Sequence, residues 1–376
     1  MTSAAEQFAS NINLASFAKA EELKKRLLFT LGALIVYRLG TFVPLPGIDP
    51  EAFSQGFQSQ SGGLLGTLNI FAGGAVERMA IFALNIMPYI SASIIMQLMT
   101  AVVPQLEAIK KEGEQGRRQI NQYTRYLTVF LATMQGYFIV VSLQASPGFV
   151  TNPGPYFLLT GTITLVGGVM FLLWLGEQIT ARGVGNGVSL IIFAGIVAEL
   201  PRAIAGLLDQ GRTGAGIGGG MILLIALLAL ALIAFVVFME RSQRRVIVQY
   251  PRRQVGQRMT QGEKSHLPLK LNVSGVIPPI FASSLLLLPA TAMGAIGEGA
   301  PNWLENLQFW FAPGRPLYIG FYAALIIGFT FVYTSVVFNV EDVADNLKKY
   351  GGFIQGYRPG ARTADYLDYV LSLIHI

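Results

Sequence analysis

Long stretches without a charged side chain recur along this chain, separated by short segments rich in charge, glycine or proline. A bilayer core about 30 Å thick requires roughly 20 mostly apolar residues per helix, and these stretches reach that length. One of them, 126–176, is too long for a single helix and is divided by the turn-forming sequence SPGFVTNPGP at 146–155. The pattern therefore predicts eight transmembrane helices, over 27–44, 79–106, 126–145, 156–176, 183–198 with a continuation past Glu199 and Arg202, 213–239, 271–297 and 316–340.

Lysine and arginine are distributed unevenly between the segments that join these spans. If the N-terminus is cytoplasmic, 22 of the 27 basic residues fall on the cytoplasmic side, and the positive-inside rule therefore predicts that orientation for both termini. The first 25 residues are polar, and Asn11–Leu28 has a helical apolar rhythm, so we expect an amphipathic surface helix rather than a cleavable signal peptide. The five basic residues outside or near the outer ends are Arg38, Arg78, Arg202, Arg212 and Arg315.

Composition narrows the function classes. The 376 residues are 52% hydrophobic and only 13% charged, with a formal net charge of +6, whereas a soluble domain is about one quarter charged. The absence of cysteine excludes disulfides, thiol catalysis and Cys-ligated metals, and His266 and His375 alone offer little for a histidine site. The predicted spans hold no cluster of ionisable groups at mid-membrane; Glu199 and Arg202, three residues apart, are expected to pair on one helical face. We therefore expect neither enzymatic activity nor a cofactor.

Two of the predicted spans contain proline among polar side chains. Pro88 lies mid-span in NIMPYISASII, and Pro278 lies early in GVIPPIFASS. Proline removes a helical hydrogen bond and kinks the helix, which a membrane tolerates where a neighbour or a cavity satisfies the freed carbonyl. Packing kinks and hinges are both compatible with this pattern. Nearby polar residues indicate that both spans face a partner helix or water: Ser91, Ser93, Gln97, Ser283 and Ser284.

Three connecting segments carry further signals. Gly62–Gly74 (GGLLGTLNIFAGG) is apolar but too short to span, and it is equally compatible with a surface helix and with a short piece folded back into the protein. The glycines of ARGVGNG, 181–187, lack the strand and helix of a phosphate-binding βαβ unit, so they predict a tight cytoplasmic turn. The basic loop 241–270 contains a strand pattern at Val246–Tyr250 followed by the turn PRRQ, which predicts a cytosolic hairpin. Nucleic acid or anionic lipid could bind there, although positive-inside topology alone also explains the charges.

At these motifs the chain resembles the SecY family of protein-translocation channels. The departures are small: Asn85 stands where the family commonly has Gly, and Val188 where it commonly has Ile. The resemblance implies an all-α polytopic membrane protein whose two inverted halves hold five helices each. The stretches that carry it span roughly residues 20–370 in the family's order: NIMPYISASIIMQLMT, WLGEQITARGVGNGVSLIIFAG, IKKEGEQGRRQINQYTRY, HLPLKLNVSGVIPPIFASS, VFNVEDVADNLKK and YRPGARTADYLD.

The resemblance also implies how the chain is organised. The family has ten spans, so we expect the last two to be missing here and keep a non-functional fragment of the channel as an alternative. The last six residues, LSLIHI, match one reading frame of a sequencing-adapter end. The expected parts are a cytoplasmic amphipathic N-terminus at 1–26, a first half of five transmembrane helices at 27–209 with a plug at 62–74, an incomplete second half of three transmembrane helices at 210–340 with a cytoplasmic loop at 240–270, a cytoplasmic loop at 341–370, and a non-native tail at 371–376.

Functional residues are carried over from the family by position. The implied pore is an hourglass that a ring of aliphatic side chains narrows at mid-membrane; stiff β-branched side chains suit such a gasket, and a hydrophobic constriction blocks ions by dewetting. The expected ring is Ile86, Ile90, Val188, Ile192 and Ile280; the plug is Leu64, Leu65, Leu68, Ile70 and Phe71; the lateral gate is Pro88, Ser91, Gln97, Pro278, Ser283 and Ser284; and the ribosome or motor docking residues are Arg252, Arg253, Arg258 and Arg358.

The resemblance implies a passive channel that moves secretory polypeptides across the bacterial cytoplasmic (inner) membrane and releases membrane helices laterally. The chain has no Walker motif, so the energy would come from elsewhere. The implied partners are the SecE and SecG subunits, the SecA motor, the ribosome, polypeptides that carry a signal sequence, and membrane lipids. A secondary transporter built on internal repeats is the rival class, and it would need coupled charges at the midplane that these spans lack.

Overall fold

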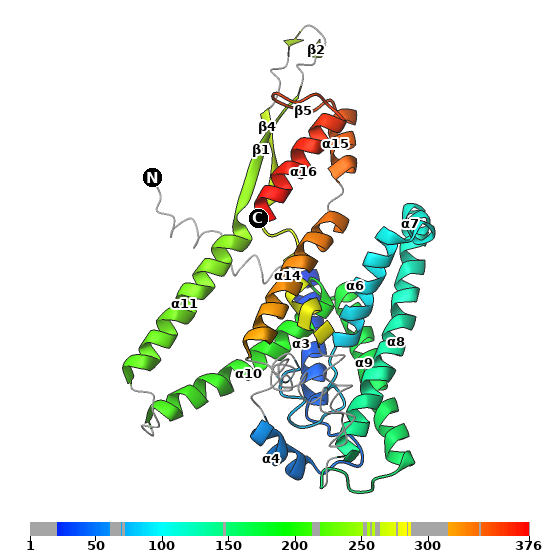
Figure 1. Ribbon diagram of the computed structural model, residues 1–376, viewed down its shortest axis with the longest axis vertical. Helices are drawn as coiled ribbons and strands as arrows, with labels where there is room; N and C mark the ends of the chain where they lie inside the picture. The colour runs from blue at the N-terminus through cyan, green and yellow to red at the C-terminus, as the bar shows by residue number, and fades with distance from the viewer. Residues whose placement is uncertain are drawn as a thin grey trace. The chain divides into compact units, whose positions relative to one another are not determined.

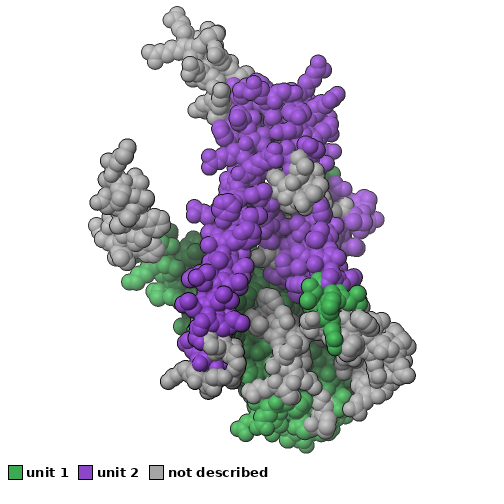
Figure 2. Space-filling view, turned by 60° about the vertical axis from the view of Figure 1, so that its left-hand side comes forward, with its two compact units in different colours: residues 1–96, 108–205, 284–319 green, residues 97–107, 206–283, 320–376 purple. Residues whose placement is uncertain are grey.

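The computed structural model is mostly helical, with a small β-sheet (Figure 1). It describes residues 21–60, 69, 72–145, 148–212, 219–250, 254–255, 258–259, 264–275, 277–283, 285–286, 315–337 and 340–375. The chain divides into two compact units, coloured separately in Figure 2. The first unit comprises residues 1–96, 108–205 and 284–319, and the second comprises 97–107, 206–283 and 320–376.

Five of the described helices are long and apolar enough to cross a membrane, and α6 and α7 together count as a sixth, broken span. The five are α8, α9, α10, α11 and α14, and they confirm the corresponding predicted spans. The helix α3 covers residues 27–40 of the predicted first span and carries charge at both ends. Of the predicted span 271–297, residues 276, 284 and 287–297 lie outside the described residues. The helices are α3 Glu21–Gly40, α4 Pro50–Gln60, α6 Met87–Val102, α7 Pro104–Lys111, α8 Glu114–Ala145, α9 Pro155–Arg182, α10 Gly187–Arg212, α11 Gly219–Arg241, α14 Pro316–Val337, α15 Val340–Lys349 and α16 Ala361–His375.

The predicted span 79–106 is not one continuous helix. Residues 72–86 form successive turns, and α6 begins only at Met87. Pro88 therefore lies in the first turn, where its missing N–H has no helical acceptor to lose, and its prediction as a mid-span kink was wrong. Asn85, two residues before the helix, has φ +48°, a left-handed conformation that asparagine tolerates better than most residues. These two residues explain why the helix starts late.

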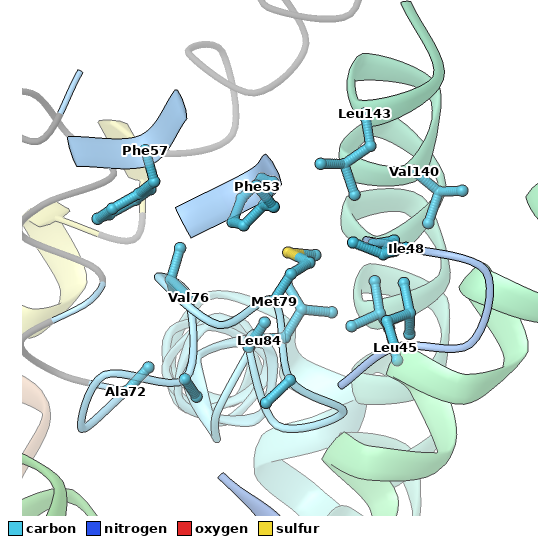
Figure 3. Packing of buried hydrophobic residues seen from close by; sticks show 14 of the residues in the cluster. Leu45, Ile48, Phe53, Phe57, Ala72, Val76, Met79, Leu84, Val140 and Leu143 are labelled. Carbon is cyan, nitrogen blue, oxygen red and sulfur yellow. The ribbon is translucent and has the colours of Figure 1, made fainter. Parts of the chain in front are cut away.

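The core of the first unit includes this turn segment. Figure 3 shows Val76, Met79 and Leu84 of the turns gathered with Phe53 of α4 and Val140 of α8, and all five are buried. Because close packing of this kind removes apolar surface from water, it stabilises a segment that lacks regular helical hydrogen bonds. The turn segment, residues 72–86, is therefore an integral part of the hydrophobic core of the first unit.

The glycine-rich sequence between α9 and α10 is the tight turn that its pattern predicts. Gly187 begins α10 so close to α9 that a Cβ there would collide with the carbonyl oxygen of Gly176. The Thr180 hydroxyl accepts a hydrogen bond from the Gly187 N–H at 2.9 Å, and the Thr30 hydroxyl of α3 accepts one from the Val184 N–H at 3.2 Å. The turn thus ties three helices of the first unit together.

The second unit contains the predicted hairpin and a third strand that the sequence did not indicate. Strand β1 (Gln243–Gln249) pairs antiparallel with β4 (Lys264–Lys270) over seven residue pairs, and β5 (Phe353–Ile354) pairs with the other edge of β1. Two short strands, β2 (Gln254–Val255) and β3 (Arg258–Met259), pair with each other further out. Figure 1 shows α15 and α16 beside this sheet. They share a core with it that includes Val246, Val248, Leu269, Ile354, Leu367 and Val370.

Candidate functional site

Three of the predicted ring residues lie together in one hydrophobic cluster of the first unit. Ile86, the last residue before α6, is only 1% exposed, and Ile90 and Val188 are half-buried against the same cluster. Tyr37 of α3 and Leu172 of α9 complete the packing around them. The turn segment and the start of α10, about one hundred residues apart in sequence, therefore bring aliphatic side chains to a common place.

The start of α10 presents two different aliphatic faces. Ile191, which the sequence did not single out, is fully buried in the cluster, whereas Ile192 is half-buried. Successive helical residues are turned by about 100°, so Val188 and Ile192 share the face that adjoins the packed one. Partial exposure is what a side chain at a constriction requires. Ile280 is also half-buried, and it belongs to the second unit.

The predicted gate serines are satisfied by their own helices. Ser91 of α6 is 3% exposed and donates to the Met87 carbonyl at 3.2 Å, and Ser283 donates to the Ile280 carbonyl at 2.8 Å. Gln97 is exposed and Pro278 is buried. The hydroxyls of Ser91 and Ser283 are therefore satisfied by the preceding turn of their own helices. Ser284 lies outside the described residues.

A packed contact holds the described helical residues 277–283 on α14 within the second unit. The Tyr322 hydroxyl donates to the Pro279 carbonyl at 3.2 Å. The rings of Phe281 and Phe329 meet edge to face, with their centroids 4.1 Å apart, a favoured orientation for aromatic pairs. The helical residues that carry Ile280 are therefore packed against α14.

The predicted plug residues Leu64, Leu65, Leu68, Ile70 and Phe71 lie outside the described residues, but the end of the predicted plug segment 62–74 does not. Asn69 and residues 72–74 are described, and the Gly74 N–H donates to the Asn69 carbonyl at 2.9 Å. Gly73 and Gly74 have φ values of +63° and +78°, which glycine adopts without steric cost. The predicted plug segment therefore ends in a defined glycine turn.

Charged side chains that the sequence did not bring together surround this turn; we call Arg38, Glu77, Arg78, Glu199 and Arg202 the arginine–glutamate cluster. Arg38 donates to the Gly73 carbonyl at 2.5 Å, and Arg78 donates to the same carbonyl at 3.2 Å. Arg38 also lies 3.9 Å from the Glu199 carboxylate. Arg202 binds both oxygens of Glu77, at 2.8 and 2.9 Å. The expected pairing of Glu199 with Arg202 was therefore wrong, because each finds a partner on another element.

The pKa of Arg78, which lies outside the helical spans, reflects the opposing charges of this cluster. Burial, followed by the neighbouring charge of Arg38, lowers the pKa of Arg78 from its ordinary value, whereas Glu199 and Glu77 raise it. The two carboxylates thus offset the cost of placing three guanidinium groups close together. Arg78 also lies over the ring of Phe42, at 4.2 Å from the centroid.

The predicted docking residues are described only in part. Arg358 is exposed on the turn between β5 and α16, whose backbone is held by a hydrogen bond from the Thr363 hydroxyl to the Arg358 carbonyl at 2.8 Å. Arg258 belongs to the short strand β3. Arg252 and Arg253 lie outside the described residues. Within the described part of the chain, no group of three or more His, Asp or Glu side chains is placed to hold a metal.

Comparison with known proteins defines the class. The SecY family profile matches residues 80–376. The protein translocase subunit SecY of Escherichia coli K12 is 53% identical over 355 residues, which cover 93% of this chain and 80% of that protein. The SecY subunit of Vibrio cholerae is 52% identical over 359 residues, again covering 93% and 80%.

Solved structures give the same fold at 16% identity while covering 94% of this chain. A protein-conducting channel matches with a TM-score of 0.66 over 82% of its length. A SecY channel whose plug domain stabilises the closed state and maintains a membrane seal matches with 0.65 over 82%, and Sec61 from a canine ribosome–channel complex matches with 0.61 over 83%.

The fold and the apolar helices define a multi-pass membrane protein with the architecture of a protein-conducting channel. Within that class, the match to the family profile and the identity to curated relatives settle the assignment: the chain belongs to the SecY family.

Proposed function

We propose that this chain is the channel-forming subunit of a protein translocase, which conducts secretory polypeptides across a membrane and releases apolar helices into it. The observation that carries the proposal is the 53% identity over 93% of the chain to a protein translocase subunit. The fold shared with protein-conducting channels supports it. The chain would act as a channel and not as an enzyme, with energy supplied by a partner.

In this proposal Ile86, Ile90, Val188 and Ile192 form part of the pore ring, and Ile280 of the second half contributes to it. The clustering of Ile86, Ile90 and Val188 supports this assignment, as does the half-buried state of Ile192 and Ile280. A ring of aliphatic side chains with partial exposure excludes ions by dewetting while fitting around a polypeptide. The plug at 62–74 would seat against the ring at rest.

The lateral gate would be formed by α6 and the helical residues that contain Pro278. Both begin with proline in the first turn, and Ser91 and Ser283 donate to carbonyls of their own helices. A helix pair of this kind can separate without leaving broken backbone hydrogen bonds in lipid. Signal sequences would enter between them.

The second unit's sheet and the turn bearing Arg358 would dock the ribosome or the SecA motor, together with Arg252, Arg253 and Arg258. The exposed position of Arg358 and the basic hairpin support this role. The remaining proposed partners are SecE and SecG. The proposed location is the bacterial inner membrane with the N-terminus in the cytoplasm, because 22 of 27 basic residues then lie inside.

Replacing the resident channel subunit of a bacterial cell with this chain tests the function. We expect a secreted reporter to reach the periplasm only when it carries a signal sequence. Accumulation of the reporter precursor in the cytoplasm, with the chain present in the membrane at normal amounts, would contradict the proposal. A solute-uptake assay on the same membranes separates the rival transporter class, for which we expect no substrate-dependent flux.

A further inference from the structure

The arginine–glutamate cluster accounts for the position of three basic residues that do not follow the positive-inside pattern. Arg38, Arg78 and Arg202 were predicted to lie outside or near the outer ends of the spans, and in the first unit all three converge near one glycine turn. They come from α3, from the turn segment and from α10. Charges that serve only solubility or topology would not be expected to meet in this way.

The contacts of the cluster converge on a short segment that includes the end of the predicted plug; Glu199 acts on it through Arg38. We call the described residues Asn69 and 72–78 the latch segment. Its Gly73 carbonyl accepts from Arg38 and Arg78, and its Glu77 carboxylate binds Arg202 in a bidentate pair. Inside the segment, the Glu77 N–H donates to the Asn69 side-chain oxygen at 2.9 Å. The segment is thus held from α3 on one side and from α10 on the other.

Two glycines make this approach sterically feasible. A Cβ on Gly74 would meet the Glu199 carboxylate and the Arg78 guanidinium, and a Cβ on Gly73 would lie 3.0 Å from the Gly195 Cα of α10. Both glycines also adopt positive φ. The backbone of the latch segment therefore lies directly against α10, where any side chain would displace the charged groups.

We propose that the Glu77–Arg202 pair, supported by Arg38 and Glu199, is a specificity-determining latch. It holds the latch segment on α10 in the resting channel and sets how strongly a signal sequence must act before the plug leaves. This inference rests on the proposed function for its consequence in transport. The latch itself is a statement about the first unit and can be tested without transport.

The burial of the two partners predicts an asymmetry between their substitutions. The Glu77 side chain is 12% exposed, whereas that of Arg202 is 58% exposed. Removing the arginine takes the bidentate partner from a largely buried carboxylate, to which the Asn69 amide also donates at 3.5 Å. Removing the carboxylate leaves an arginine that water can solvate. Arg202→Gln should therefore release the segment more than Glu77→Gln does.

The chain contains no cysteine, so a single introduced thiol reports release of the segment. Val76 is 6% exposed and adjoins Glu77, and Val76→Cys removes volume rather than adding it. In the full-length Val76→Cys chain in membranes, a water-soluble maleimide should modify the introduced thiol slowly. We expect the rate to rise about fivefold when Arg202→Gln is added, the factor that one partly exposed ion pair is worth, and less with Glu77→Gln. The double variant Glu77→Gln/Arg202→Gln should be modified no faster than Arg202→Gln alone, because the two substitutions break the same interaction.

The pair Arg125–Glu177 provides a matched control, since it joins α8 to α9, neither of which contributes to the cluster. Its partners lie 2.6 Å apart and are 49% and 41% exposed. In the Val76→Cys background, Glu177→Gln should leave the rate of thiol modification unchanged. The latch would be overturned if Arg202→Gln left the rate unchanged, or if Glu177→Gln raised it equally. It would also be overturned if the effects of Arg202→Gln and Glu77→Gln multiplied in the double variant.

Export of a reporter whose signal sequence has a shortened apolar core gives the second readout. In cells that depend on this chain, Arg202→Gln should increase export of that reporter about fivefold while export with an intact signal stays within about twofold. If the unsubstituted chain exports neither reporter, the proposed function fails and the maleimide result still decides the latch. If it exports the intact reporter but Arg202→Gln does not relax selectivity, the specificity role fails alone.

Discussion

Single aliphatic side chains carry the proposed seal, and this predicts an ion leak. Ile86 and Ile90 are four residues apart and lie in the same cluster. Replacing both with serine should make a constriction wettable, so we expect planar bilayers containing the variant to conduct at rest where the unsubstituted channel does not. Leu227 and Leu230 of α11, 65% and 68% exposed, form the control: the same two substitutions there should leave resting conductance unchanged. Equal conductance in the two variants would exclude the ring assignment.

A close approach of the α9 and α10 backbones gives a second prediction for a single residue. A Cβ at Gly187 would collide with the Gly176 carbonyl, and relief of such overpacking costs about 1–3 kcal/mol. Gly187→Ala should therefore lower the midpoint of thermal unfolding in detergent. Gly206→Ala in the same helix has open space around it and should leave the midpoint unchanged or raise it slightly, because alanine favours helix over glycine. A lower midpoint for Gly206→Ala would show that helix geometry alone, and not the α9–α10 contact, is responsible.

At the scale of elements, the sheet of the second unit depends on side chains that face α15 and α16. Val248 of β1 is 2% exposed, whereas its neighbour Ile247 points away and is 48% exposed. Truncating a buried aliphatic side chain costs about 2 kcal/mol, so Val248→Ala should speed limited proteolysis of the loop 240–270. Ile247→Ala should not change the digestion rate. Similar rates for both variants would mean that the strand does not share a core with α16.

The sequence predicted elements far better than it predicted their ends and pairings. Apolar length located α8, α9, α11 and α14, and the strand-like stretch Val246–Tyr250 followed by the turn PRRQ located the hairpin, because these signals are local. The start of α6 at Met87 was missed, since it depends on the left-handed Asn85 and on packing of the turns before it. Strand β5 was missed because two residues give no periodicity. The bidentate pair of Glu77 with Arg202 joins residues 125 positions apart, and local spacing favoured Glu199 instead.

At the scale of the whole molecule, the proposed function combines a membrane-spanning channel with a cytosolic docking surface. Arg358 is exposed on a turn that α16 and β5 hold in place, so Arg358→Glu should change a contact without changing the fold. We expect motor-driven translocation to fall about tenfold, the effect of reversing one interfacial charge, while the amount of chain in the membrane stays normal. Normal translocation by this variant would remove Arg358 from the docking surface.

The central claim is that a polypeptide passes through the ring, and cross-linking tests it most directly. Because the chain has no cysteine, a single one can be placed at Ile90 or Ile192, or at Leu227 on the exposed face of α11. A secretory precursor with one cysteine, stalled midway through the membrane, should form a disulfide with positions 90 and 192 and not with position 227, and only when its signal sequence is intact. Cross-linking at position 227 alone, or at positions 90 and 192 regardless of the signal sequence, would contradict this claim.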